Sequence, residues 1–278
     1  MKKYLYKLVS VFVLVGVGQV LSVWFLSYIT NNYNESAVAS IARFDAAFML
    51  VIGALSIGVG QYFPRLLISD ITFSASLNDA RVLRILVSLF LTILGFGMVF
   101  LGEFEYALVF SSAFLLALGV EYALYVRGRQ LSAAFCSFLK VSGIYLVFVV
   151  VSVFGVTLDD DELPYIYFTA FVLFSLITSL ISIAALKNRF QVNWIVPNKE
   201  VLKGVAQLGG AFFVYSSVKG LIIPVIDPVL NDVDLVNVFV FLKLYLVVFS
   251  VRRVYVQFVH QWLGDEKKAV LMNFLYFI

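Results

Sequence analysis

Eight runs of about twenty mostly apolar residues constrain this chain more than any other feature of its sequence. Each run is long enough to cross the roughly 30 Å hydrocarbon core of a bilayer as a helix. Because backbone N–H and C=O groups find no water there, such runs must be helices and cannot be open strands. The runs cover residues 8–30, 39–63, 85–102, 106–126, 137–157, 165–186, 204–226 and 235–256. The sequence therefore predicts an all-α, polytopic membrane protein, a helical bundle.

The composition agrees with a membrane protein. Apolar residues make up 62% of the chain and charged residues 13%, whereas a soluble domain holds about 25% charged residues. Cys136 is the only cysteine and His260 the only histidine, so neither an intrachain disulfide nor a multi-histidine metal site is available. The first run continues to about residue 29 without a small-residue cleavage site, so we expect an uncleaved first span. We expect no metal, no cofactor and no nucleic-acid partner.

The connections between the runs differ in charge, and the difference predicts their sides of the membrane. The loops 31–38, 103–105, 158–164 and 227–234 hold no lysine or arginine. Sixteen of the 20 basic residues lie in or beside the other connections: Lys2, Lys3, Lys7, Arg65, Arg81, Arg84, Arg127, Arg129, Lys187, Arg189, Lys199, Lys203, Arg252, Arg253, Lys267 and Lys268. Since cytoplasmic loops carry the excess of lysine and arginine, the N-terminus is expected in the cytoplasm.

The runs fall into two unequal groups. Residues 1–186 hold six runs and form an expected six-helix lobe, residues 187–203 a polar cytoplasmic linker, and residues 204–278 the start of a second lobe. The last ten residues, AVLMNFLYFI, are apolar but too short to cross a bilayer. We therefore expect a partial ninth helix in a truncated or fragmentary chain; the alternative is a surface or re-entrant tail.

Three stretches carry a family resemblance: GVGQVLSVWFLSYI, RFDAAFMLVIGALSIGVGQYFPR and LKGVAQLGGAFFVYSSVKGLIIPVIDP. The first two resemble the opening helices, and the third the seventh helix, of bacterial polysaccharide flippases. These belong to the multidrug, oligosaccharidyl-lipid and polysaccharide exporter superfamily. The resemblance is one of pattern and covers most of the chain. It implies two six-helix lobes around a cavity; this chain lacks helices nine to twelve, which puts activity on its own in doubt.

Six charged residues lie within the runs, where charge is costly and marks a functional site by default. They are Arg43, Asp45, Glu121, Lys140, Lys219 and Lys243. Arg43 and Asp45 are two residues apart and so project from different faces of a helix. We expect their partners on the seventh or eighth run, across a hydrated cavity. The alternative for Asp45, Lys219 and Lys243 is a structural salt bridge between helices; Arg43 and Lys140 can also reach the interface by snorkelling.

The resemblance implies export of a lipid-linked oligosaccharide of the undecaprenyl-pyrophosphate type for a surface polysaccharide such as O-antigen, lipopolysaccharide or capsule. On this hypothesis Arg43, Lys140, Lys219 and Lys243 bind the anionic cargo, because basic groups donate charge-assisted hydrogen bonds to phosphate. Asp45 and Glu121 are candidates for ion coupling. The chain would lie in the bacterial inner membrane, with other membrane proteins of polysaccharide assembly as possible partners.

Three other functions remain open. A small-cation or drug exporter of the same superfamily would prefer acids to bases in its cavity, and the spans hold four basic residues against two acids. A membrane enzyme of polysaccharide assembly would need a substantial catalytic loop, but the outer loops have at most about eight residues. An inactive remnant is the third alternative, because of the expected truncation.

Overall fold

The computed structural model describes residues 2–56, 73–186, 194, 197 and 199–262. Of the residues within its helices, the side chains of 2–8, 73, 125–126, 130, 208–219 and 248–262 lie outside that description. The helices are α1 (Lys2–Asn32), α2 (Glu35–Leu55), α4 (Phe73–Phe100), α5 (Phe104–Ser111), α6 (Ala113–Ala117), α7 (Glu121–Val126), α8 (Gln130–Val153), α9 (Leu163–Ala185), α10 (Lys199–Ile226), the short 3₁₀ helix η1 (Asp227–Val229) and α11 (Asp232–Trp262). The described residues contain no strand, which confirms the all-helical prediction.

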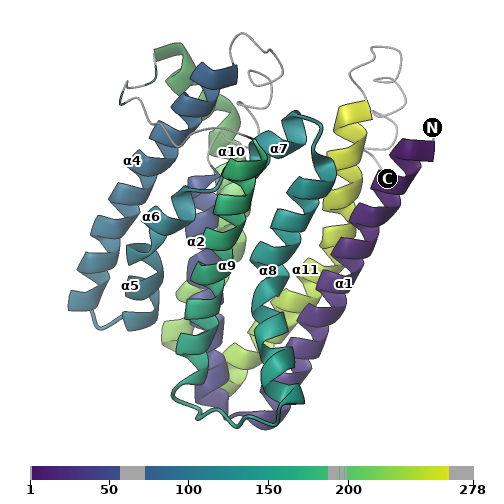
Figure 1. The fold of residues 1–278 in the computed structure, drawn as a ribbon. Helices are drawn as coiled ribbons and strands as arrows, with labels where there is room; N and C mark the ends of the chain where they lie inside the picture. The colour runs from purple at the N-terminus through teal and green to yellow at the C-terminus, as the bar shows by residue number, and fades with distance from the viewer. Residues whose placement is uncertain (1, 57–72, 187–193, 195–196, 198, 263–278) are drawn as a thin grey trace.

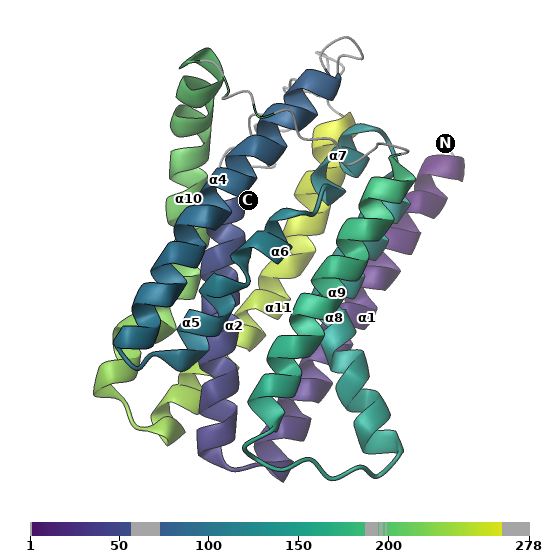
Figure 2. The same ribbon diagram turned by 60° about the vertical axis from the view of Figure 1, so that its left-hand side comes forward.

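The long helices run up and down, and the connections that lack lysine and arginine meet at one end. The α1–α2, α4–α5, α8–α9 and α10–α11 turns all lie at the lower ends of their helices in Figures 1 and 2. A side-chain hydrogen bond joins two of these turns, since Asn34 Nδ2 donates to Asp160 Oδ2 at 2.6 Å. The charge pattern of the loops therefore corresponds to a real grouping of the turns in space.

Local sequence signals set these turns. Asn34 caps α2, because its Oδ1 accepts a hydrogen bond from the backbone N–H of Ala37 at 2.8 Å. Gly102 and Gly155 end α4 and α8 with φ of 80° and 62°, a left-handed conformation that glycine adopts without steric cost. Pro164 lies in the first turn of α9, where its missing N–H costs nothing. The α4–α5 and α8–α9 turns join helices that pack against each other, whereas α1 packs mainly on α8 and only slightly on α2.

Five helices of the described part are long and apolar enough to cross a membrane, or six if one bent pair counts as a single span. The five are Val9–Asn32, Glu35–Leu55, Ser74–Phe100, Leu131–Val153 and Leu163–Ala185. The bent pair, Phe104–Ser111 with Ala113–Leu124, turns by 43°. The prediction of one continuous helix over 106–126 is therefore wrong: the helix is interrupted at Ser112 and again at 118–120, and the surroundings of the second interruption are described with the site below.

Other parts of the sequence prediction remain predictions. Helices α10 and α11 occupy the seventh and eighth runs, but neither is among the five candidate spans of the described residues. The predicted number of eight spans therefore remains a prediction. The end of the second run (57–63), much of the linker (187–193) and the partial ninth helix (269–278) lie outside the described residues. The division into lobes at 187–203 is likewise a prediction.

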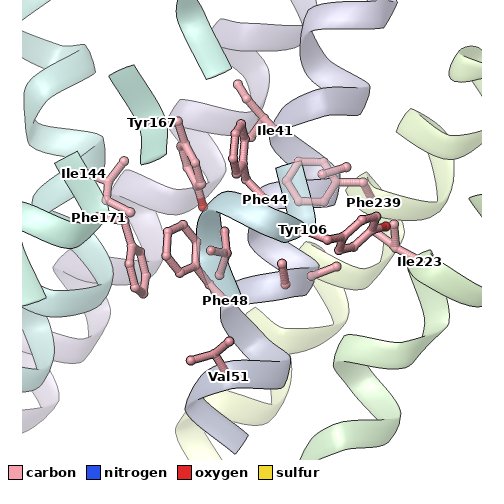
Figure 3. Packing of buried hydrophobic residues seen from close by; sticks show 14 of the residues in the cluster. Ile41, Phe44, Phe48, Val51, Tyr106, Ile144, Tyr167, Phe171, Ile223 and Phe239 are labelled. Carbon is pink, nitrogen blue, oxygen red and sulfur yellow. The ribbon is translucent and has the colours of Figure 1, made fainter. Parts of the chain in front are cut away.

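Helix α2 forms the centre of the bundle and is the most buried of the five candidate spans. Its aromatic side chains pack against α9: the ring centroids of Phe48 and Phe171 are 3.8 Å apart, and Phe44 packs against Phe168 at 5.5 Å. Figure 3 shows Phe48 and Phe171 beside each other, with Tyr167 and Phe44 above them and Ile223 and Phe239 on the other side of α2. Because other helices surround much of α2, the side chains of Arg43 and Asp45 meet residues of neighbouring elements.

Candidate functional site

The side chain of Arg43 extends from the central helix α2 toward the turn between α10 and α11. Its Nε and Nη2 donate to the two carboxylate oxygens of Asp227 at 2.9 Å each, a bidentate arrangement. Nη2 also lies 3.2 Å from Asp232 Oδ1 at the start of α11. The hydroxyl of Tyr106, on α5, donates to Asp227 at 3.4 Å. One guanidinium thus connects α2 to both ends of the α10–α11 turn.

The side chain of Asp45 extends from another face of α2 and pairs with Lys243 of α11. The Nζ–Oδ1 distance is 2.6 Å, and the two side chains are 10% and 13% exposed, so the pair is almost completely removed from solvent. The hydroxyl of Tyr167, on α9, donates to the same oxygen at 2.7 Å. Asp45 therefore links α2 with α9 and α11 at one point. A buried pair of this kind is held by its hydrogen bonds as much as by its charges.

The expected location of the partner is confirmed for Asp45, because Lys243 lies on the eighth run. It is wrong for Arg43, whose partners Asp227 and Asp232 lie in the connection between the seventh and eighth runs. Arg43 and Asp45 do not pair with each other, and both find their partners on the α10–α11 hairpin. The alternative reading of Asp45 and Lys243, a salt bridge between helices, describes their geometry as well. Their functional roles remain predictions, because a salt bridge is compatible with both a structural and a transport role.

A cavity of about 360 Å³ adjoins the Asp45–Lys243 pair. It lies between α2, α10 and α11, and its wall is mainly apolar. The lining residues are Asp45, Ala46, Met49, Ile222, Ile223, Phe239, Phe241, Leu242, Lys243, Tyr245 and Leu246. Arg43, Lys140 and Glu121 are not among them. Of the predicted cavity cations with described side chains, only Lys243 lines this cavity, and the side chain of Lys219 lies outside the described residues.

A second polar cluster lies where the fourth run is interrupted. Lys140 Nζ, on α8, lies 2.8 Å from Glu121 Oε1 at the start of α7, with 12% and 16% of the side chains exposed. Arg84 Nη2, on α4, donates to the carbonyl of Leu116 at 3.0 Å. Ser182 Oγ, on α9, accepts from the backbone N–H of Val120 at 3.3 Å. Neighbouring side chains thus satisfy backbone groups that the break in the helix leaves without helical partners.

Arg84 shows what the sequence prediction missed. It was assigned with Arg81 to a cytoplasmic connection, but both belong to α4 and are buried, with 8% and 5% exposure. The guanidinium of Arg84 also lies 5.7 Å from the centre of the Tyr122 ring. The sequence holds a signal for this position: Arg81 and Arg84 are three residues apart, and therefore share a helix face just before an apolar run.

Comparisons with protein-family models, with curated proteins and with solved structures found no significant match. The geometry described above is therefore the basis for any functional proposal beyond the resemblance in sequence pattern.

Proposed function

We propose that this chain is a transporter of the bacterial inner membrane that flips a lipid-linked oligosaccharide by alternating access, with its N-terminus in the cytoplasm. The resemblance in sequence pattern supports a lipid-linked oligosaccharide as the cargo. The grouping of the turns without lysine and arginine at one end of the bundle supports the orientation, because such turns belong on the outer side.

The observation that carries the proposal is the pairing of two charges on α2 with the α10–α11 hairpin, beside a cavity. Alternating access requires a contact between parts of the protein that exists in one state and is absent in another. Ion pairs can serve in this way, because a charged ligand competes directly for their members. An apolar contact of the same area would offer no such competition.

Three of the four cations proposed to bind the cargo already have carboxylate partners. Arg43, Lys140 and Lys243 each face a carboxylate at 3.2 Å or less. A diphosphate would have to displace these carboxylates to bind there. Lys219, whose side chain lies outside the described residues, is proposed from the sequence as the phosphate contact, with the other three as groups that exchange partners. Asp45 and Glu121 are the carboxylates released by such an exchange, which is why they remain the candidates for ion coupling.

Export of the polysaccharide repeat unit tests this proposal. The chain is expressed, with the glycan-assembly enzymes of its native host, in cells that lack an oligosaccharide flippase, and surface glycan is measured. Lys219→Ala should abolish surface display, because a phosphate would lose its cationic partner. Lys219→Arg should retain part of it, because the charge remains while the hydrogen-bonding shape changes.

The matched control is Lys203→Ala, which removes an exposed lysine from the first turns of the same helix. It should leave display unchanged, and immunoblots of membrane fractions should show equal insertion of all variants. Normal surface display by the Lys219→Ala variant would show that Lys219 is not the phosphate contact. Failure of the unaltered chain to restore display would reject a lipid-linked oligosaccharide as the cargo.

A further inference from the structure

The break between α6 and α7 separates two backbone groups that a continuous helix would join. In an uninterrupted α-helix the N–H of Val120 donates to the carbonyl of Leu116, four residues earlier. Here each group has a partner on another helix. Arg84 Nη2, on α4, donates to the Leu116 carbonyl at 3.0 Å, and the Val120 N–H donates to Ser182 Oγ, on α9, at 3.3 Å. Two neighbouring helices thus hold the two halves of one missing helical hydrogen bond.

The same groups are also satisfied if the helix closes. The two backbone groups would then bind each other, and Ser182 Oγ would keep the hydrogen bond that it donates to the Ser179 carbonyl at 2.8 Å. Arg84 would need a new acceptor. Glu121, which interacts electrostatically with Arg84, has a buried Oε2 without a hydrogen-bond partner among the described residues. Because a buried polar group is costly mainly when it is unpaired, the two arrangements are close in hydrogen-bonding energy.

Gly119, in the middle of the break, favours the broken arrangement. A Cβ on Gly119 would lie 3.0 Å from Cδ of Glu121. The Glu121 carboxylate is held by Lys140 at 2.8 Å, so it cannot move aside without weakening that ion pair. In a continuous helix residues 119 and 121 would project from different faces, and the clash would not arise. Alanine at this position would therefore oppose the broken form and, as the better helix former, favour the closed one.

We propose that residues 118–120 form a two-position joint, which alternates between the broken form held by Arg84 and Ser182 and a continuous helix held by the Leu116–Val120 hydrogen bond. Extended residues rise by about 3.3 Å each and helical ones by about 1.5 Å, so closing three residues would shorten the segment by up to roughly 5 Å. Helix α7, at the upper end of the bundle in Figure 1, would move toward α6. The joint is independent of the cargo that the chain transports.

The test is double electron–electron resonance, which measures the distance between two nitroxide labels, on the full chain in lipid nanodiscs. The labels are attached at Phe114→Cys and Arg127→Cys in a Cys136→Ala background. Both positions are exposed and lie on opposite sides of the break. The protein with labels alone should show a main population at the longer distance, which corresponds to the broken form.

Two substitutions should move the population toward the shorter distance. Ser182→Ala removes the acceptor of the Val120 N–H, so the ratio of short to long distances should rise by roughly threefold to tenfold, as expected for one lost hydrogen bond. Gly119→Ala should raise the ratio by about fivefold through its helix propensity alone. The combined variant should show the shorter distance, several ångströms below the first, as its main population.

Two further variants separate the joint from general loosening of the bundle. Ser179→Ala removes another buried serine of α9, whose Oγ donates to the Ser175 carbonyl and not to the break, and it should leave the distances unchanged. Val120→Pro removes the N–H that the continuous helix needs, so it should abolish the shorter distance even when combined with Ser182→Ala. The proposal is overturned if the combined Gly119→Ala/Ser182→Ala protein keeps the longer distance. It is also overturned if Ser179→Ala shifts the population as much as Ser182→Ala does, or if the shorter distance persists with Val120→Pro.

Discussion

Asp45 joins three helices through its side chain. Its Oδ1 accepts from Lys243 of α11 and Tyr167 of α9, while its backbone belongs to α2. Charges in such surroundings are tolerated only when they are paired, because solvent cannot replace a missing partner. The two members of the pair are therefore coupled in their effect on stability, whatever their role in transport.

Neutralising one member of the pair should show this coupling. Asp45→Asn leaves the Lys243 ammonium buried without a counter-ion and should lower the free energy of unfolding by about 3–5 kcal/mol. The double variant Asp45→Asn/Lys243→Met should be less destabilised than Asp45→Asn alone, since no unpaired charge remains. Unfolding in mixed micelles measures both. Additive effects of the two substitutions would show that the pair is not coupled.

The sequence predicted these residues better than it predicted their partners. The two-residue spacing correctly indicated that Arg43 and Asp45 would not pair with each other, because helix geometry alone decides that point. Tyr167 was not singled out, since a tyrosine in an apolar run is ordinarily a packing residue. Its hydroxyl gains a role only from the packing of α9 against α2, which no local pattern encodes.

The interruption between α6 and α7 is a departure from a regular helical span. Residues 118–120 leave the helix, and three neighbouring helices contribute polar groups there: Arg84 from α4, Lys140 from α8 and Ser182 from α9. Breaks of this kind at membrane depth require such surroundings, because lipid cannot satisfy a free carbonyl or N–H. The break and the buried charges are therefore one structural feature.

Arg84→Met tests this dependence. The substitution leaves the carbonyl of Leu116 without its donor and removes a positive charge near Glu121, so we expect a loss of about 1.5–3 kcal/mol in unfolding free energy. Lys203→Met, at an exposed position of α10, should have almost no effect. The comparison is made by thermal unfolding in detergent. Equal stability of the two variants would show that Arg84 is not required at the break.

Close contact between α2 and α10 depends on one glycine. A Cβ on Gly220 would lie 2.8 Å from both the backbone nitrogen and the Cγ of Leu50, and a backbone atom cannot move aside cheaply. Gly220→Ala should therefore destabilise the protein by about 1–3 kcal/mol through overpacking.

Gly16→Ala provides the matched control for this substitution. A Cβ on Gly16 of α1 would meet nothing within 4 Å, and alanine is the better helix former, so this variant should be neutral or slightly stabilised. Thermal unfolding of the two variants measures the difference. A Gly220→Ala protein as stable as Gly16→Ala would mean that the two helices can separate at no cost.

The predicted positions of the helices were mostly close to those found, but the interruption was not foreseen. Apolar run length gave both ends of α9 and the end of α8 closely, because length and composition decide that a segment is a helix in a membrane. The start of α8, at Gln130, lies well before the predicted start at 137. The break at 118–120 lies inside an apolar run and has no proline to announce it. Its cause is tertiary, as are the buried positions of Arg81 and Arg84.

The grouping of the turns at one end of the bundle predicts which residues a reagent outside the cell can reach. In a Cys136→Ala background, Asn32→Cys at the lower end of the bundle should react with a membrane-impermeant thiol reagent in intact cells. Glu200→Cys, exposed near the start of α10, should react only after the cells are opened. Mass spectrometry or a gel shift measures the labelling. The reverse pattern would place the N-terminus outside.

The contacts of Arg43 with Asp227 and Asp232 lie at the end of a long arm. Helix α11 has 31 residues and extends for roughly 45 Å from the turn that holds them. A tilt of about 10° around that turn would carry its far end through about 8 Å, by the geometry of a rod of that length. A small rotation of α11 about these ionic contacts would thus become a displacement of several ångströms at the other end of the helix.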